Sequence, residues 1–176
     1  GLSGGQGSGK TTFAEILRII LKTKFKLNVI YFSIDDFYKT LNERKKMSKN
    51  IHKLFLTRGV PGTHDISLLK KSLFNLLKRN FKSFYMPRFD KSTDDRHPRQ
   101  KWKNIKKKPD IVIFEGWCVG ARQQNSVRLK KPINFLEKEE DKDLIWRKKV
   151  NSYLKNRYKT IFNLITIQIF LKVPNF

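Results

Sequence analysis

Cysteine, acidic residues and long apolar runs are all scarce in this sequence. A single cysteine, Cys118, stands among 176 residues, so no internal disulfide can form and a reducing, cytoplasmic setting is expected. The most apolar stretch, residues 161–173, is interrupted by Asn163, Thr166 and Gln168 and is shorter than the ~20 residues of a bilayer-spanning helix. We therefore expect neither a disulfide-stabilised secreted domain nor a membrane protein.

The shortage of acids leaves a large positive charge. Asp and Glu number 15 against 39 Lys and Arg, which gives a formal net charge of +24. Such a charge suits a nucleic-acid partner, because cations neutralise phosphates. The lysines are nevertheless spread over nearly every segment, and only residues 101–108 form a local basic run, around Trp102. This distribution favours a solvated surface over nucleic-acid binding, and it gives no indication of the oligomeric state.

Apolar residues are plentiful enough for a single folded domain over 1–176. They make up 39% of the chain and include 14 Phe and 3 Trp, and the length gives no reason to expect two domains. Apolar spacing predicts a helix over about 11–25, while β-branched and aromatic residues predict strands at 27–34, 110–114 and 164–171. Strands that alternate with helices predict an α/β fold with a parallel sheet flanked by helices.

Three further segments carry local signals. Asp65 is placed to cap a helix over 66–79. That helix is expected to turn four residues inward: Leu69, Leu73, Leu76 and Leu77. Residues 86–102 lack a consistent period and contain two prolines, so they predict a long functional or mobile loop. Residues 137–160 are highly charged and are expected to be helical.

Both ends of the sequence predict a truncated domain. A phosphate-binding loop normally follows a buried strand, yet Leu2 is the only large apolar residue before the first glycine pair of the loop described below. The chain stops at LKVPNF, directly after the last strand-like run. We expect most of the first strand, and everything after the last strand, to be missing.

The stretch GGQGSGKT (Gly4–Thr11) fits the phosphate-loop pattern G-x-x-x-x-G-K-[ST]. The overlapping LSGGQ (Leu2–Gln6) also occurs in transporter-type ATPases, but there it lies well downstream of the phosphate loop, so here it is a coincidence of letters. Glycines let backbone N–H groups turn towards a phosphate, and the following helix adds its positive end. We therefore expect ATP as the nucleotide, since no Asn-Lys-x-Asp guanine box is present. The predicted nucleotide-binding residues are Gly4, Gly5, Gln6, Gly7, Ser8, Gly9, Lys10, Thr11 and Thr12.

Acidic residues follow two of the predicted strands. Asp35 and Asp36 end the strand at 27–34, and Glu115 ends the strand at 110–114. Groups at the carboxyl ends of parallel strands converge on one crevice, and acids beside a phosphate loop indicate phosphoryl transfer. We predict Lys10, Asp35 and Glu115 as catalytic residues, with Asp35 as general base, and Thr11 and Glu115 as ligands of Mg²⁺. Asp36 either faces the substrate or caps the turn near Phe37.

Four motifs behind the phosphate loop resemble a known family. SIDDFY, RGVPGTHD, MPRFDKS followed by DDR, and IVIFEGW occur in this order. They resemble the glycerate kinase family of the plant and fungal type, within the wider phosphoribulokinase, uridine kinase and pantothenate kinase group of P-loop kinases. The resemblance covers nearly the whole chain. It implies transfer of the ATP γ-phosphate to D-glycerate, giving 3-phosphoglycerate, with Asp35 as the base and a helical lid after the final strand.

Loop cations in these motifs suit an anionic acceptor. Arg58, His64, Lys91 and Arg96 could surround a carboxylate, with Asp65 as a partner; the alternative is surface charge or ion pairs that brace the loops. The predicted substrate-binding residues are Asp36, Tyr38, Arg58, His64, Asp65, Lys91 and Arg96. Two other functions remain open: a P-loop kinase of a nucleoside, pantothenate or polyol, and a basic nucleic-acid-binding protein with a vestigial nucleotide site.

Overall fold

A parallel sheet forms the centre of the molecule. The computed structural model describes residues 1–173. Its four-stranded sheet has the order β2-β7-β1-β8, and the strands are β1 (Leu2–Gly4), β2 (Val29–Ser33), β7 (Ile111–Glu115) and β8 (Ile169–Leu171). The pairs β2–β7, β7–β1 and β1–β8 are all parallel. The predicted α/β fold with a parallel sheet is therefore confirmed.

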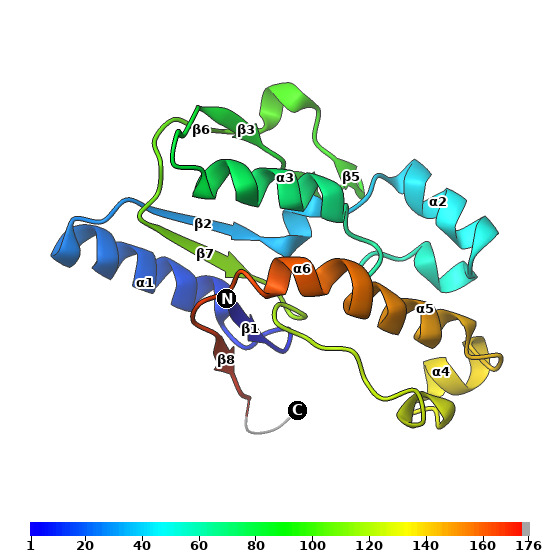
Figure 1. Ribbon diagram of the computed structural model, residues 1–176. Coiled ribbons are helices and arrows are strands. Elements are labelled where there is room, and N and C mark those ends of the chain that lie inside the picture. Colours follow the sequence, from blue (N-terminus) through cyan, green and yellow to red (C-terminus); the bar gives the residue numbers. More distant parts are fainter. Residues whose placement is uncertain (174–176) are drawn as a thin grey trace.

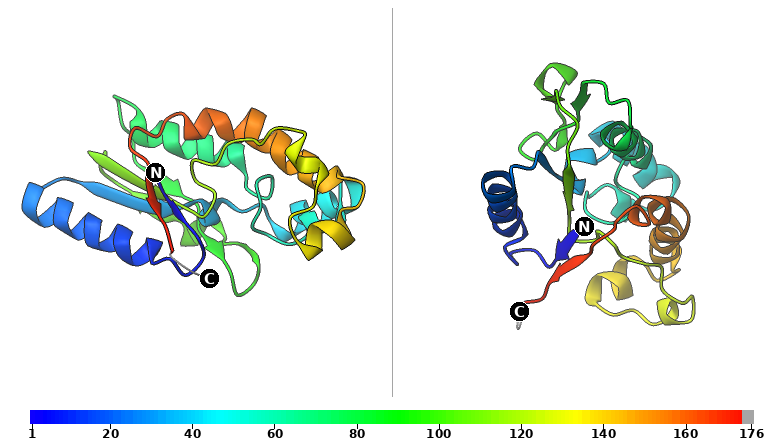
Figure 2. Two further views of the ribbon diagram at one scale, coloured as in Figure 1. Left: turned by 90° about the horizontal axis from the view of Figure 1, so that it is seen from below. Right: turned by 60° about the vertical axis from the view of Figure 1, so that its left-hand side comes forward.

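Helices cover both faces of this sheet (Figures 1 and 2). The helix α1 (Lys10–Phe25) lies on one face, where Leu2, Ala14 and Ile113 are buried together. The other face carries the larger core, under α3 (Ile66–Leu77) and the layer formed by α5 (Ile145–Tyr153) and α6 (Lys159–Phe162). Successive residues of β2 and β7 pack alternately into the two cores, so each of these strands contributes side chains to both faces of the sheet. Within residues 1–173, no helix has the length and apolar character needed to cross a membrane.

The helix α3 (Ile66–Leu77) begins where its cap was expected. The Asp65 carboxylate accepts the N–H of Leu68 at 3.0 Å. Three of the four leucines predicted to point inward are buried: Leu69, Leu73 and Leu76. Leu77 is 52% exposed, so that prediction is wrong; one residue past Leu76, a helical side chain points about 100° away from the buried stripe.

Residues 86–102 do not form an irregular loop. Antiparallel strands β3 (Phe84–Met86) and β6 (Lys103–Ile105) frame the segment, and β4 (Phe89–Asp90) pairs with β5 (Asp95–Arg96) inside it. The prediction of a long loop is wrong because strands of two or three residues are too short to show a period in sequence. The β4–β5 hairpin (residues 89–96) is called the inner hairpin below. Its turn, residues 91–94, points towards the end of β2.

The charged segment 137–160 is divided into several helical pieces. These are α4 (Phe135–Glu140), α5 (Ile145–Tyr153), a π-helix over Leu154–Tyr158, and α6 (Lys159–Phe162). The helical prediction is confirmed in type, but the break between α4 and α5 was not expected.

A buried ion pair makes this break. Asp141 is 1% exposed and Arg147 is 6% exposed. The Asp141 carboxylate accepts the backbone N–H groups of Trp146 at 2.8 Å and Arg147 at 3.0 Å, and the Arg147 Nε–H at 2.9 Å. Asp141 therefore starts α5 by accepting N–H groups of its first turn, which have no partner inside the helix.

A second buried arginine anchors α2 (Leu41–Asn50). Arg44 is fully buried, and its guanidinium donates to the carbonyl oxygens of Lys39 at 3.2 Å, Leu56 at 2.7 Å and Asp94 at 2.6 Å. It also pairs with the Asp94 carboxylate at 2.9 Å. Arg44 thus joins α2 to the inner hairpin beside the end of β2.

Candidate active site

The phosphate loop connects β1 to α1. Gly7 and Gly9 have φ angles of 76° and 78°, a left-handed conformation that glycine adopts without steric strain. The Lys10 ammonium donates to the carbonyl oxygens of Gly4 at 3.1 Å and Gly5 at 2.7 Å. The predicted strand, glycine loop and helix are therefore all present, with the lysine folded against the loop.

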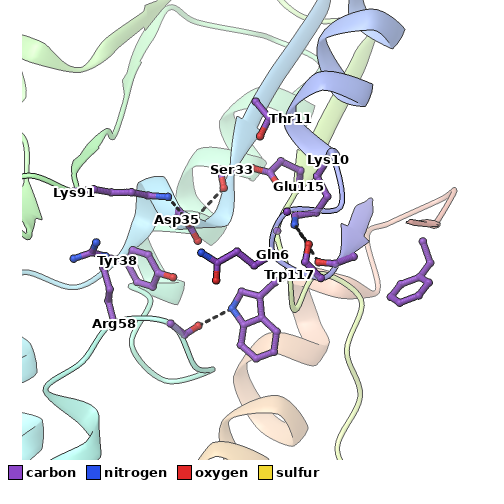
Figure 3. A pocket seen from close by; sticks show the side chains of 16 residues that line it. Gln6, Lys10, Thr11, Ser33, Asp35, Tyr38, Arg58, Lys91, Glu115 and Trp117 are labelled. Atoms are coloured by element: carbon purple, nitrogen blue, oxygen red, sulfur yellow. Dashed lines mark hydrogen bonds and ion pairs between the residues drawn. The ribbon is translucent and has the colours of Figure 1, made fainter. Parts of the chain in front are cut away.

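A cleft of about 800 Å³ opens beside this loop. Its walls come from the phosphate loop, the ends of β2 and β7, the 57–65 segment and the inner hairpin (Figure 3). Eleven of the predicted site residues line it: Gly4, Gly5, Gln6, Gly7, Lys10, Thr11, Asp35, Tyr38, Arg58, Lys91 and Glu115. Seven others do not: Ser8, Gly9, Thr12, Asp36, His64, Asp65 and Arg96.

The two adjacent acids after β2 have different positions. Asp35 lines the cleft, and its carboxylate accepts the Lys91 ammonium at 2.8 Å. Asp36 instead accepts the Ser33 N–H at 3.4 Å, while the Ser33 hydroxyl accepts the Asp35 N–H at 3.2 Å, which together cap the 3₁₀ turn Ile34–Phe37. Burial raises the pKa of Asp36. Of the two readings of Asp36, the structure fits the capping one.

Glu115 ends β7 on the phosphate-loop side of the cleft. It is 6% exposed and accepts the Tyr31 hydroxyl at 3.4 Å. Burial raises the pKa of Glu115, a hydrogen bond from Ser33 opposes this, and the Asp35 charge raises the pKa further. Thr11 lies on the same side of the cleft (Figure 3).

These residues fit a magnesium ion that is held mainly by its nucleotide. Among residues 1–173, no three His, Cys, Asp or Glu side chains form a metal cluster. Mg²⁺ in nucleotide sites is usually bound by one or two protein groups together with waters and phosphate oxygens. The Thr11 hydroxyl and the Glu115 carboxylate are oxygen donors of the expected kind, at the expected side of the cleft.

His64 is not the loop cation that was predicted. It is 1% exposed, and burial lowers its pKa to about 3, so the imidazole is neutral. Its ring stacks on Tyr38 with centroids 4.5 Å apart, and the two residues pair in an antiparallel bridge. Sequence could not reveal this, because a histidine in a polar loop is ordinarily exposed. His64 lies behind the cleft wall that Tyr38 forms.

Arg96 and Asp65 bind each other instead of lining the cleft. Their side chains lie 3.3 Å apart, and Arg96 also donates to the Tyr38 carbonyl at 2.9 Å. Asp65 is further used as the α3 cap. The geometry therefore fits the alternative interpretation, in which Arg96 and Asp65 form an ion pair that braces the loop.

Two of the predicted loop cations, Arg58 and Lys91, do line the cleft. Lys91 pairs with Asp35 from the inner hairpin. Arg58 forms an ion pair with Asp94, whose carboxylate also binds the buried Arg44. Figure 3 shows both cations on one side of Asp35, opposite Lys10. The cleft is therefore basic at both ends, with the carboxylate of Asp35 between.

Sequence reasoning missed five lining residues: Ser33, Gly59, Gly116, Trp117 and Phe170. The indole N–H of Trp117 donates to the Gly59 carbonyl at 3.0 Å, which joins two rims of the cleft (Figure 3). Four of the five lie in or directly beside the recognised motifs, so their positions, although not their contacts, could have been found. The position of Phe170 at the cleft depends on the pairing of β8 with β1, which the sequence does not reveal.

Replacing Glu115 by Gln is expected to stabilise the protein at neutral pH. Because the folded-state pKa of Glu115 is raised above its usual 4.5, the folded state binds more protons than the unfolded state, and ionisation disfavours folding. This penalty is absent below about pH 4.5 and complete above the folded-state pKa. Thermal unfolding midpoints of both proteins between about pH 4 and 8 should therefore converge on the acid side. A difference that is constant with pH would contradict this.

The whole sequence matches a family of known proteins. A family model for phosphoribulokinase / uridine kinase covers residues 1–176. The chain belongs to the phosphoribulokinase / uridine kinase family. Its motifs predicted this wider group, and that prediction is confirmed, together with the P-loop fold that the family shares.

Three relatives show the range of similarity within the family. The uncharacterized kinase mug58 of Schizosaccharomyces pombe is 39% identical over 136 residues, 73% of this chain and 49% of that protein. The chloroplastic D-glycerate 3-kinase of Arabidopsis thaliana is 33% identical over 130 residues, 69% of this chain and 28% of that protein. The structure of D-glycerate 3-kinase from Cryptococcus neoformans shares the fold with a TM-score of 0.79 at 24% identity, over 96% of this chain and 61% of that chain. The matched region thus spans half or less of these two sequence relatives.

Proposed function

We propose that this chain is the core of an ATP-dependent kinase that phosphorylates a hydroxyl group of a small hydroxy acid, with D-glycerate as the first candidate and 3-phosphoglycerate as product. The observation that carries the proposal is the position of Asp35, in one cleft with the phosphate loop on one side and the cations Arg58 and Lys91 on the other. Membership of a kinase family supports the reaction class, and the glycerate kinase relatives support the acceptor.

Different residues of the cleft have different roles in the proposed phosphoryl transfer. Phosphoryl transfer needs alignment and charge stabilisation more than covalent help. The phosphate loop and Lys10 bind the β- and γ-phosphates. Thr11 and Glu115 would hold Mg²⁺, which would neutralise phosphate charge. Asp35 accepts the proton of the attacking hydroxyl, which increases the nucleophilicity of its oxygen.

The cations at the acceptor end select an anion. Arg58 is held by Asp94, and Lys91 by Asp35, so both ammonium and guanidinium groups are already placed at the cleft wall. A carboxylate that lies between them would form charge-assisted hydrogen bonds, which are stronger than neutral ones. The Trp117–Gly59 hydrogen bond closes one rim beside Arg58, which limits the acceptor to a small molecule.

D-Glycerate and glycerol together test this assignment, since glycerol has the hydroxyl groups but lacks the carboxylate. With Mg-ATP, we expect D-glycerate to accelerate ADP release with a kcat/KM at least about 10-fold above that of glycerol, because a charged hydrogen bond contributes roughly 1.5–3 kcal/mol. Equal rates would remove the carboxylate assignment. A clear preference for a nucleoside or for pantothenate would retain the kinase and replace its acceptor.

A further inference from the structure

Tyr158 has a hydroxyl group that the proposed chemistry does not use. Its side chain is fully buried and belongs to the π-helix Leu154–Tyr158, a rare and wide helical turn that often occurs at functional sites. The hydroxyl reaches the loop 57–65 that follows α2. It accepts the N–H of Gly62 at 2.8 Å and lies 2.7 Å from His64 Nδ1.

The available protons determine the direction of the second bond. A phenol has one hydrogen to donate, and its oxygen also accepts. If His64 Nδ1 donated, the Tyr158 O–H and the Nε2 lone pair would both be buried without a partner among residues 1–173, whereas a donating Tyr158 leaves only the Nε2–H unpaired. Tyr158 therefore donates to Nδ1. Since the His64 ring is neutral, its hydrogen is on Nε2.

No other hydrogen bond orients this imidazole. His64 Nε2 is buried and has no hydrogen-bond partner in the part of the chain that the structure describes. The Tyr158 bond alone distinguishes the observed ring orientation from the flipped one. The ring in turn stacks on Tyr38 at 4.5 Å with an interplanar angle of 19°.

Tyr38 connects His64 to the cleft, because one face of its ring stacks on His64 and the residue also lines the cleft. Tyr38 lines the cleft beside Asp35 (Figure 3). Burial, and after it the nearby Asp35 carboxylate, raises the pKa of the Tyr38 phenol. A displacement of His64 would therefore move the wall that faces the proposed base, and would leave the phosphate loop in place.

We propose that Tyr158 is a positioning residue for acceptor binding: its hydroxyl fixes the Nε2–H tautomer and the ring orientation of His64, and through the stacked Tyr38 it fixes the acceptor wall next to Asp35. This inference rests on the proposed kinase function. It gives the π-helix Leu154–Tyr158 a role in acceptor binding. It also predicts that loss of the Tyr158 hydroxyl weakens binding of the acceptor and leaves binding of ATP unchanged.

The variant Tyr158→Phe tests the inference because it removes only the hydroxyl. We expect kcat/KM for D-glycerate to fall about tenfold, the effect of one lost hydrogen bond of ordinary strength, with the KM for ATP unchanged. We also expect ¹⁵N NMR of the imidazoles to show the Nε2–H tautomer of His64 in the unmodified protein and a loss of that single state in the variant.

Tyr153→Phe is the matched control. Tyr153 lies on the preceding helix α5 and packs its ring against Phe55, and none of the hydrogen bonds among residues 1–173 involves its hydroxyl. We expect no change in either measurement for this variant.

Two results would overturn the inference. One is a Tyr158→Phe variant that matches Tyr153→Phe in both measurements. The other is a parallel rise in the KM values for ATP and acceptor, which would indicate a general structural role. If the unmodified protein transferred no phosphate to any acceptor, the proposed function would fail, and the NMR comparison alone would then decide whether Tyr158 controls His64.

Discussion

The Asp35→Asn variant is expected to lose about 10³-fold in kcat while it binds ATP as tightly as the unmodified protein. A positioned general base contributes roughly 10²–10⁴-fold to a rate, and Asn has the same shape but cannot accept the proton. Asp35 also pairs with Lys91 at 2.8 Å, so the substitution leaves that cation without its partner. ADP release with Mg-ATP and D-glycerate measures kcat, and calorimetric titration with ATP measures nucleotide binding.

Asp36→Asn provides a control at the adjacent position. Asp36 caps the 3₁₀ turn and does not line the cleft, and Asn can retain much of a capping interaction. We therefore expect kcat close to that of the unmodified protein. Asp35 would be excluded as the base if Asp35→Asn retained more than about a tenth of kcat, or if both variants lost activity equally.

Asp141→Ala is expected to lower the free energy of unfolding by about 3–5 kcal/mol, the range measured when one partner of a buried ion pair is removed. Arg147 would then be buried with no carboxylate to accept its Nε–H. The first N–H groups of α5 would also lose their acceptor. Urea unfolding monitored by circular dichroism gives the free energy, since a loss of this size is a large part of typical domain stability.

Two further variants separate the buried pair from its surroundings. Glu140→Ala removes the neighbouring acid, which forms an exposed pair with Lys53, and we expect little change because exposed pairs contribute little. Replacing Asp141 and Arg147 together by Leu should recover part of the loss, since the buried Arg147 charge is removed with its main partner, while Glu137 loses only its longer 3.4 Å contact with Arg147. If Asp141→Ala unfolded at the same urea concentration as Glu140→Ala, the ion pair would have no special role.

The parts of the site that sequence predicted are those that depend on local pattern. A glycine-rich loop, a lysine and a helix are consecutive in the chain, so Lys10 and Thr11 could be assigned without a tertiary structure. Asp35 and Glu115 needed one further step. Both follow apolar strands, and the carboxyl ends of parallel strands meet at one edge of the sheet.

The parts that sequence missed depend on contacts between distant segments. His64 was predicted as a cation because it lies in the loop motif RGVPGTHD, but its ring contacts Tyr38 and Tyr158, which lie far from it in sequence. The helix break at Asp141 depends on the burial of Arg147, which no local period reveals. Trp117 was visible in a motif, whereas its hydrogen bond to Gly59 exists only after β7 and the 57–65 loop meet.

The place of β1 in the sheet has a consequence for synthesis on the ribosome. Within residues 1–173, the pairing partners of β1 are strands that are made much later: Leu2 pairs with Glu115 in β7, and residues 2–4 pair with Ile169–Leu171 in β8. At about 5–20 residues per second, the first of these partners is translated roughly 5–20 s after β1. Until then β1, which leads into the phosphate loop, is not paired in the sheet. ATP therefore cannot stabilise the nascent chain by binding to a folded phosphate loop. β1 therefore precedes both of its partners in the chain, yet it is among the last of the described strands to gain its neighbours.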